Sequence, residues 1–239
     1  MKARSTRAFF ISGPHVRSCP RWRDLESASM SATPDAGRAS LDRLRALSDG
    51  IFAFAMTLLV LDVRLPAGTA PLTSATLLAS MQALLPAVAA CVLSFLVLCM
   101  YWIAHHNTFL VVARSNRPLV ALSMLFLLCI AFIPFAASVL ARGPHLPLAI
   151  IGYGACLTLT SLVLLALVQY ALGGGRLAEA SPRMDALRKA AIRRVLAAIA
   201  LYAASMALAP WQPTVSLLAY VLLPLVYLLP SAVDHWAKN

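Results

Sequence analysis

Charge is what this chain of 239 residues has least of. Only 12% of its residues are charged, and its 9 acidic side chains are outnumbered by 20 lysines and arginines. About a quarter of the residues of a soluble domain are charged. With 61% hydrophobic residues and a mean hydropathy of +0.80, the chain is predicted to be an all-α polytopic membrane protein rather than a soluble domain. Since each span needs about 20 apolar residues, the chain has room for about six.

Groups with catalytic or metal-binding potential are also few. The sequence contains no hydrolase, kinase, P-loop or dinucleotide motif, so we expect neither an enzyme nor a bound cofactor. The cysteines are Cys19, Cys91, Cys99, Cys129 and Cys156. Four of them lie inside apolar runs, without the spacing of a metal site. We therefore expect reduced, buried cysteines and no metal.

The net charge of +11 is distributed as in a membrane protein rather than a nucleic-acid-binding protein. Nine of the 20 cations lie in residues 1–45, and six more lie from Arg176 to Arg194. With the N-terminus in the cytoplasm, 18 of the 20 fall on the inner side, and only Arg64 and Arg142 fall outside. Cytoplasmic loops carry such an excess of Lys and Arg. The sequence thus predicts a multi-pass membrane protein with both termini cytoplasmic and no nucleic-acid partner.

The chain divides into three predicted regions. Residues 1–40 are basic and rich in Ser and Pro, and we expect them to be disordered. Met30 is an alternative start, which would leave residues 1–29 untranslated. Residues 41–232 form the predicted six-helix transmembrane domain, and residues 233–239 form the predicted short cytoplasmic tail.

Six spans are predicted within the second region. They cover residues 41–63, 87–112, 118–140, 147–172, 187–209 and 214–230. The apolar region from residue 74 to residue 112 is too long for one span. We expect Pro86 to divide it into a short interfacial helix and the second span.

A carboxylate stands near the start of the first span. Asp49 would cost about 2.5–3.5 kcal/mol near the bilayer centre and therefore needs a partner. At 100° per residue, Asp49 lies about 140° from Phe54 around the helix. Phe54, Leu58 and Leu61 share one stripe, with Thr57 at its border. Asp49 is therefore expected to face neighbouring helices rather than whatever this stripe lines.

The partner of Asp49 is not given by the first span itself. Arg43 is six residues away, which excludes a simple i,i+4 pair and favours contact through another residue or helix. Alternatively, Ser48 and Asp49 cap a helix that begins at Gly50. Such a helix would reach about 21 Å by residue 63, which is short of the roughly 30 Å hydrocarbon core.

A second polar group lies at the inner end of the second span. Trp102 shares a helix face with His105 at i,i+3 and with His106 at i,i+4. A histidine N–H that donates to Asp49 would satisfy both groups. The alternative is an interfacial aromatic belt with polar residues at a helix end.

Two further patterns favour structural roles. Gly152-Tyr153-Gly154 is similar to part of a K⁺-channel filter, but apolar helix surrounds it, so close helix packing is the better interpretation. Four cations open the fifth span, namely Arg188, Lys189, Arg193 and Arg194. We expect them to anchor that helix in anionic headgroups, with gating by acidic lipid as the alternative.

The first span resembles the transmembrane protein 175 family, which comprises endolysosomal K⁺ channels and their bacterial relatives. The family motif is Arg-xxx-Phe-Ser-Asp, followed by Gly-x-Phe-Ala-x-Ala-x-Thr-Leu-Leu-Val-Leu. The chain matches it from Arg43 through Ser48 and Asp49, with Leu47 in place of the phenylalanine. The segments Trp102-xx-His105-His106 and Ile133-Pro134-Phe135 are also similar to family features.

The resemblance implies a homotetramer with six spans per subunit, whose first helices surround a pore for potassium ions without a carbonyl filter. The implied pore and gate residues are Phe54, Thr57, Leu58 and Leu61. The implied polar network between helices is Arg43, Ser48, Asp49, Trp102, His105 and His106. Family members usually carry isoleucine or leucine at the position of Phe54, so a bulkier ring is expected to narrow this pore.

Two functional hypotheses follow from these residues. The first is a passive potassium-permeable channel with apolar constrictions, embedded in the lipid bilayer. The alternative is a proton-coupled secondary transporter that uses Asp49 and His105 as a proton relay. A non-conducting structural membrane protein is the third possibility.

Overall fold

The structure, a computed structural model, describes residues 34–65, 73–173, 177 and 182–228, and every regular element in these ranges is an α-helix. The helices are α2 (Pro34–Leu61), α3 (Ser74–Ala83), α4 (Leu85–Leu110), α5 (Arg117–Arg142), α6 (Pro147–Leu172), α7 (Pro182–Leu208) and α8 (Pro213–Leu228). The predicted all-α class is confirmed. Residues 1–33, with Met30, and the predicted tail lie outside the described ranges, and α2 begins before the predicted residue 41.

Prolines mark the starts of the long helices. Pro86, Pro118 and Pro147 each stand in the first turn of a helix, where the missing N–H costs nothing and the fixed φ fits. The predicted division at Pro86 is confirmed, because α3 ends at Ala83 and α4 begins at Leu85. The Asn116 side chain caps α5 by accepting the backbone N–H of Leu119 at 3.0 Å.

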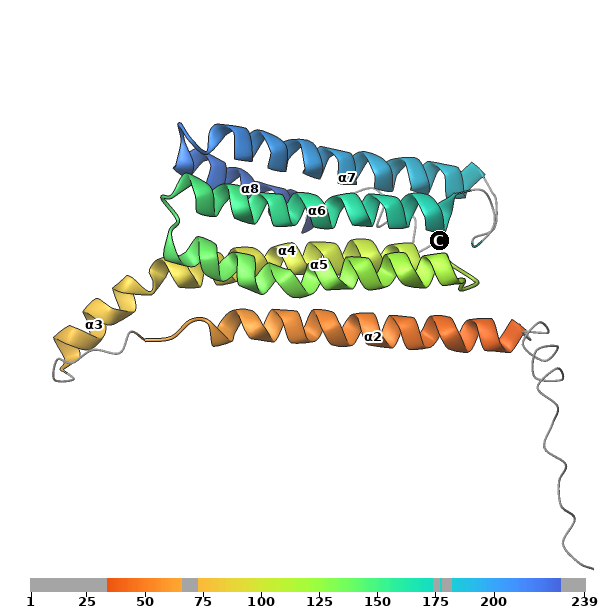
Figure 1. Ribbon diagram of the computed structural model, residues 1–239, viewed down its shortest axis with the longest axis horizontal. Helices are drawn as coiled ribbons and strands as arrows, with labels where there is room; N and C mark the ends of the chain where they lie inside the picture. The colour runs from red at the N-terminus through yellow and green to blue at the C-terminus, as the bar shows by residue number, and fades with distance from the viewer. Residues whose placement is uncertain (1–33, 66–72, 174–176, 178–181, 229–239) are drawn as a thin grey trace, which may run out of the picture.

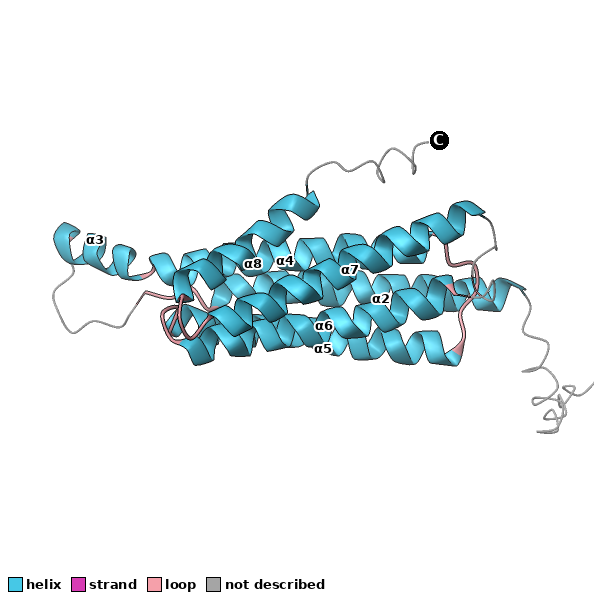
Figure 2. Cartoon of the chain, turned by 90° about the horizontal axis from the view of Figure 1, so that it is seen from above, coloured by secondary structure: helices cyan, strands magenta, loops and turns pink. Residues whose placement is uncertain are grey.

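The long helices run antiparallel in one bundle (Figures 1 and 2). Helix α6 packs between α5 and α7, and α8 packs against α7 and α4. Helix α2 packs against α4 and α5 and forms one edge of the bundle in Figure 1, while α3 projects from one end. Among the described residues, one face of α2 therefore has no neighbouring helix.

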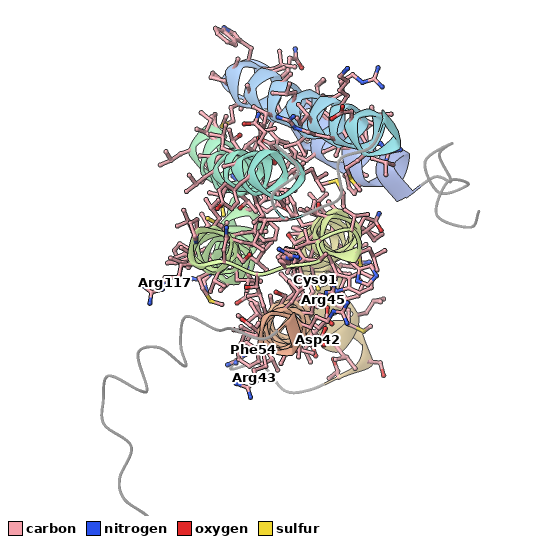
Figure 3. All side chains as sticks on the ribbon, turned by 90° about the vertical axis from the view of Figure 1, so that its right-hand side faces the viewer. Asp42, Arg43, Arg45, Phe54, Cys91 and Arg117 are labelled. Atoms are coloured by element: carbon pink, nitrogen blue, oxygen red, sulfur yellow. The ribbon has the colours of Figure 1, made fainter. Side chains whose placement is uncertain are left out.

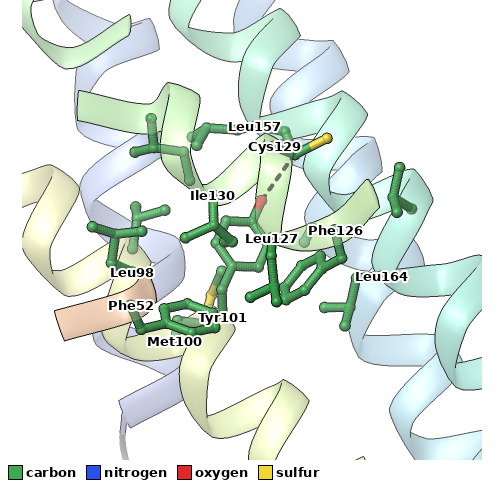
Figure 4. Packing of buried hydrophobic residues seen from close by; sticks show 14 of the residues in the cluster. Phe52, Leu98, Met100, Tyr101, Phe126, Leu127, Cys129, Ile130, Leu157 and Leu164 are labelled. Atoms are coloured by element: carbon green, nitrogen blue, oxygen red, sulfur yellow. Dashed lines mark hydrogen bonds between the residues drawn. The ribbon is translucent and has the colours of Figure 1, made fainter. Parts of the chain in front are cut away.

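The core of the bundle is apolar, and several of its hydroxyl groups, such as that of Tyr101, are paired inside it. Figure 4 shows Phe126, Ile130 and Leu157 packed around Tyr101. The Tyr101 hydroxyl donates to the Leu157 carbonyl at 2.9 Å and lies 2.8 Å from the Ser161 hydroxyl. Such pairing is needed because lipid offers a buried polar group no alternative partner.

Five helices are long and apolar enough to cross a membrane. Their candidate spans are Arg38–Leu61, Leu85–Leu110, Arg117–Arg142, Pro147–Leu172 and Met184–Leu208. The sixth predicted span, at residues 214–230, corresponds to α8, whose described apolar part Pro213–Pro224 is shorter. A sixth crossing therefore stays a prediction.

Candidate functional site

The two faces of α2 differ sharply in burial. Leu44, Phe52 and Leu59 are buried against the bundle, at spacings that place them on one face. On the other side, Phe54 is 65% exposed and Leu61 is 59% exposed. Figure 3 shows Phe54 and Arg43 on the outer side of α2, away from the other helices. Large apolar side chains are thus presented on a face that no described part of the chain covers.

The predicted pore residues lie on or beside this uncovered face. Phe54, Thr57 and Leu61 are exposed, whereas Leu58 is half-buried and lies at the edge of the face. The Thr57 hydroxyl donates to the Phe54 carbonyl at 2.8 Å. Its proton is therefore used inside the helix, and its oxygen lone pairs remain available on the exposed side.

A hydrogen bond between side chains joins α2 to α4. The indole Nε1–H of Trp102 donates to the Asp49 carboxylate at 2.8 Å. The His106 ring stacks on the Trp102 ring, with centroids 5.1 Å apart and an interplanar angle of 21°. The donor to Asp49 is thus the tryptophan rather than a histidine, and His106 supports the indole from its face. This bond fixes the rotation of α2 about its own axis.

His105 lies inside an aromatic cluster rather than beside the carboxylate. Its ring stacks on Phe109 and Phe126, with centroids 4.4 Å and 5.4 Å away, and it lies 6.2 Å from the Phe52 ring. The residue is 3% exposed, and its Nε2 atom has no hydrogen-bond partner among the described residues. This buried polar atom faces aromatic rings from α2, α4 and α5.

Ser48 and Arg43, two residues of the predicted polar network, do not contact Asp49 through their side chains in the described chain. The Ser48 hydroxyl donates to the Leu44 carbonyl at 2.8 Å, within its own helix. Arg43 is exposed, and no contact joins it to Asp49 in the described chain. Because α2 runs unbroken from Pro34 to Leu61, the alternative in which Ser48 and Asp49 cap a helix starting at Gly50 is wrong.

Arg45 makes the inward contacts, and sequence reasoning missed it. Its guanidinium pairs with Asp42 at 3.2 Å and also donates to the Phe109 carbonyl, which ties α2 to the end of α4. The signal was present in the sequence, because Arg45 and Asp49 are four residues apart and share a helix face.

These groups surround one cavity of about 200 Å³ at the junction of α2 and α4. Its lining residues are Arg45, Asp49, His105, His106, Phe109 and Leu110. A cation, a carboxylate and two imidazoles give the cavity both donors and acceptors, so it has room and partners for water. Among the described residues, no group of three or more acidic, histidine or cysteine side chains is arranged to hold a metal ion.

The sequence pattern similar to part of a K⁺-channel filter lies in the interior of a helix. Gly152, Tyr153 and Gly154 lie within α6, and Tyr153 is buried with its hydroxyl 3.0 Å from the Ser94 hydroxyl. A Cβ atom at Gly154 would overlap the side chains of Tyr220 and Met206. Gly154 permits close helix packing, as the sequence predicted, whereas Gly152 has open space beside it. The carbonyls of both glycines belong to a helix rather than to a filter loop.

Comparisons with known proteins identify a matching family profile and similar channel proteins. A profile of the family described as Endosomal/lysosomal potassium channel TMEM175 matches residues 43–134. A potassium channel of Streptomyces collinus is 35% identical over 193 residues, which cover 77% of this chain and 90% of that protein. The Endosomal/lysosomal proton channel TMEM175 of Danio rerio is 30% identical over 148 residues, covering 61% of this chain and 28% of that protein.

A solved structure is similar in fold over most of the chain. It is the crystal structure of a lysosomal potassium-selective channel TMEM175 homolog from Chamaesiphon minutus. The TM-score is 0.69 at 25% sequence identity, and the match covers 79% of this chain and 96% of that one. The similarity therefore extends well beyond the segment of α2, α4 and α5 that the family profile matches.

Proposed function

Because this chain belongs to the TMEM175 family, we propose that it is a potassium-permeable channel in which four copies surround one pore with their α2 helices. Its bacterial relatives from Streptomyces collinus and Chamaesiphon minutus are named potassium channels. The observation that carries the proposal is the uncovered face of α2, which presents large apolar side chains beside a threonine. The chain acts as a channel, not as an enzyme.

The spacing of the exposed residues supports a parallel ring of α2 helices. Leu47, Gly50, Phe54, Thr57 and Leu61 are exposed and follow each other at intervals of three and four residues. This period of about 3.5 residues keeps one seam of a helix facing a common axis over several turns. Ala46, Ala53 and Val60 beside this seam are exposed as well, so the seam is the middle of a wider uncovered face, and the threonine within it suits a pore better than lipid.

The exposed side chains then supply the gate. Rings of Phe54 and Leu61 would form apolar constrictions that close the pore by dewetting, with Leu58 at the edge of the lining. The Thr57 hydroxyl oxygens would form a polar layer between these rings, able to replace part of the water around a potassium ion. The size of Phe54 favours a narrow pore with low conductance.

The contacts on the inner side of α2 would hold that seam in register. Rotation of α2 by one residue would turn Phe54 by about 100° away from the axis. The Trp102 to Asp49 bond and the contact of Arg45 with Phe109 oppose such rotation. In this proposal Arg43 joins the network only through a neighbouring copy, because it faces outward within its own chain.

The proposed orientation in the membrane follows from the different numbers of cations at the two ends of the bundle. The cations near the first end, where α2 and α7 begin, are Arg38, Arg43, Arg45, Arg114, Arg117, Arg188, Lys189, Arg193 and Arg194, and those at the other end are Arg64 and Arg142. This asymmetry supports a cytoplasmic first end in the bacterial inner membrane. With α8 as the sixth span, both termini are cytoplasmic.

The deciding experiment is a flux assay on purified protein in liposomes. A potassium gradient should produce a membrane potential that follows the K⁺ ratio and is unaffected by collapse of the pH gradient. The controls are empty liposomes and liposomes with Phe54→Trp. The bulkier tryptophan ring should narrow the proposed pore, so this variant should conduct less. Absence of an electrogenic K⁺ leak, with the protein folded and incorporated, would contradict the channel.

A proton pathway is the second candidate, and one observation favours it. The buried Nε2 of His105 has no partner among the described residues, although its residue lines the same cavity as Asp49. A relay through these two groups would make the potential follow the pH gradient instead of the K⁺ gradient. His105→Gln and Asp49→Asn should then abolish flux, whereas the potassium channel should retain it.

A further inference from the structure

A second cavity lies at the basic end of the bundle, away from α2. It has a volume of about 120 Å³ and lies between α4, α6 and α7, with Leu223 of α8 also in its lining. Its floor is formed by buried side chains that include Tyr101, Leu164 and Val168, while Asn107 at its rim is exposed. The Tyr101 hydroxyl is already bonded to Leu157 and Ser161, so the floor offers little to a polar guest. An apolar cavity of this size stays dry and accepts an apolar guest.

One wall of the cavity carries an arginine where an apolar residue is expected. Leu187, Ala191, Arg194 and Ala198 all line the cavity, and their spacing places them on one stripe of α7. Arg194 is about 21 Å along the helix from Leu208, and this distance is shorter than the roughly 30 Å hydrocarbon core. Its α-carbon therefore lies at the depth of lipid chains, and a charge at that depth marks a functional contact.

The geometry of α7 turns this charge toward the headgroups. Helical side chains tilt toward the helix N-terminus, which for α7 is the basic end, and a long arginine reaches the interface while its stem stays in apolar surroundings. Arg188 lies one turn and a half closer to that end and follows Leu187 of the cavity wall. Its guanidinium lies beside Gly173, the residue after Leu172 of the α6 wall, and its Nε is buried without a hydrogen-bond partner among the described residues.

Charge on this helix is strongly of one sign. Helix α7 carries five cations and a single carboxylate, Asp185, which is exposed in the first turn. The apolar cavity matches an acyl chain, and the guanidinium groups toward the basic end of α7 match an anionic phosphate, so together they fit an amphiphile that carries both. Free phosphate would match only the upper half of this arrangement.

We propose that the cavity between α4, α6 and α7 binds one acyl chain of an anionic phospholipid of the inner leaflet, whose phosphate is held by Arg194 and Arg188. The site is independent of the pore, because it lies on the side of α4 that faces away from α2. Binding at this site would make the lipid a fixed component of each subunit rather than part of the surrounding bilayer.

The test measures thermal unfolding of the full-length protein in detergent as phosphatidylglycerol with two eight-carbon chains is added. We expect this lipid to raise the unfolding midpoint in a saturable manner, with no saturable rise for phosphatidylcholine of the same chain length. Inorganic phosphate at equal concentration should have no effect. An equal effect of phosphate would overturn the lipid assignment, and an equal effect of phosphatidylcholine would overturn the role of charge.

Variants separate the two halves of the site. Arg194→Gln should raise the lipid concentration for the half-maximal shift by roughly tenfold, because it removes a charge-assisted contact. Arg194→Lys should recover most of that loss, and Arg142→Gln, an exposed arginine at the other end, should behave as wild type. Ala191→Leu should weaken binding by filling the cavity, and Ala191→Phe should do so more strongly.

Folding of each variant is checked by its circular dichroism and its elution as a single species before lipid is added. If the phenylalanine variant fails this check, the leucine variant decides the role of the cavity. Unchanged lipid dependence in a folded Ala191→Leu protein would place the acyl chain elsewhere and overturn the proposal. Unchanged dependence in Arg194→Gln would do the same for the headgroup.

Discussion

At the scale of single residues, the contact between Asp49 and Trp102 explains how a charged group is tolerated in an apolar helix. The carboxylate accepts the indole N–H at 2.8 Å, and the His106 ring covers the indole. A tryptophan suits this position because it donates one hydrogen bond and is otherwise apolar. In the proposed channel, the polar motif of α2 would serve mainly to hold the helix in place.

The first prediction concerns this bond. Trp102→Phe keeps an aromatic ring for His106 but removes the donor, so the Asp49 carboxylate loses its partner on α4. Hydrogen bonds to charged groups contribute about 1.5–3 kcal/mol, and the exposure of Asp49 in a single chain favours the lower end of that range. Thermal unfolding in detergent and K⁺ flux in liposomes should both report the loss.

The matched control for Trp102→Phe is Trp211→Phe. Trp211 is 75% exposed beyond the end of α7, and no hydrogen bond of its indole is found in the described chain. This substitution should leave stability and flux unchanged. If the two substitutions had equal effects, the Asp49 contact would have no special role.

The second prediction concerns the exposed leucine of the proposed gate. Leu61→Ala removes bulk from an apolar ring without opening a cavity in the subunit, because Leu61 is 59% exposed. We expect K⁺ flux to rise several-fold and K⁺ over Na⁺ discrimination to fall, with a change in subunit stability within about 0.5 kcal/mol. Both are measured with gradients of each ion in liposomes.

Two further substitutions frame the Leu61 result. Leu58→Ala should raise flux less and cost more stability, because Leu58 is half-buried. Leu148→Ala changes a leucine that is 82% exposed on α6, away from α2, and should alter neither quantity. Unchanged flux in both the Leu61 and Leu58 variants would remove the assignment of this face to the pore.

At the scale of elements, close packing of α6 against α7 and α8 gives the third prediction. A methyl group at Gly154 would overlap Tyr220 and Met206, whereas a methyl group at Gly152 meets nothing within 4 Å. Gly154→Ala should therefore destabilise the fold by about 1–3 kcal/mol through overpacking. Gly152→Ala, on the same helix, should be neutral or slightly stabilising. Unfolding in detergent measures both, and equal effects would contradict the close contact.

The positions of the helices could be predicted from the sequence because their causes are local. Apolar length fixes each long helix, and a proline in the first turn fixes where α4, α5 and α6 begin. Where a cause is weaker, the prediction shifts: α2 extends back to Pro34 because polar residues continue the helix beyond the apolar run.

The contacts between helices could be predicted only in part. The wheel of the first span separated Asp49 from Phe54, since both positions lie on one helix. The predicted histidine donor to Asp49 is wrong, because the identity of the donor depends on the distance and rotation between α2 and α4, which the wheel does not give. The contact of Arg45 with the Phe109 carbonyl also depends on how α2 and α4 pack, so the sequence did not predict it.

At the scale of the whole molecule, α2 lies at one edge of the bundle formed by the described helices. Helix α6 is enclosed by α5 and α7, and α8 closes the bundle against α4, but α2 has partners on only one side. In the proposed tetramer, further copies of the same helix complete this exposed seam, whose period is about 3.5 residues. The assembly therefore determines whether this edge helix lines a pore.

The fourth prediction tests that assembly directly. In a chain whose five native cysteines are replaced by alanine, Leu61→Cys should form disulfide-linked dimers on mild oxidation in membranes. Four α2 helices around one axis bring neighbouring copies of this position together, and a disulfide requires α-carbons about 4.4–6.8 Å apart. Oxidation should also block K⁺ flux, and a reductant should restore it, because the bond locks the proposed constriction.

The control for the fourth prediction is Leu148→Cys in the same background. Its side chain is even more exposed but lies on α6, so it should stay monomeric on denaturing gels after identical oxidation. Native mass spectrometry of the unoxidised protein should give four times the 25.6 kDa chain. A tetramer in which Leu148→Cys cross-links and Leu61→Cys does not would show that copies meet through α6, and α2 would then face lipid instead of a pore.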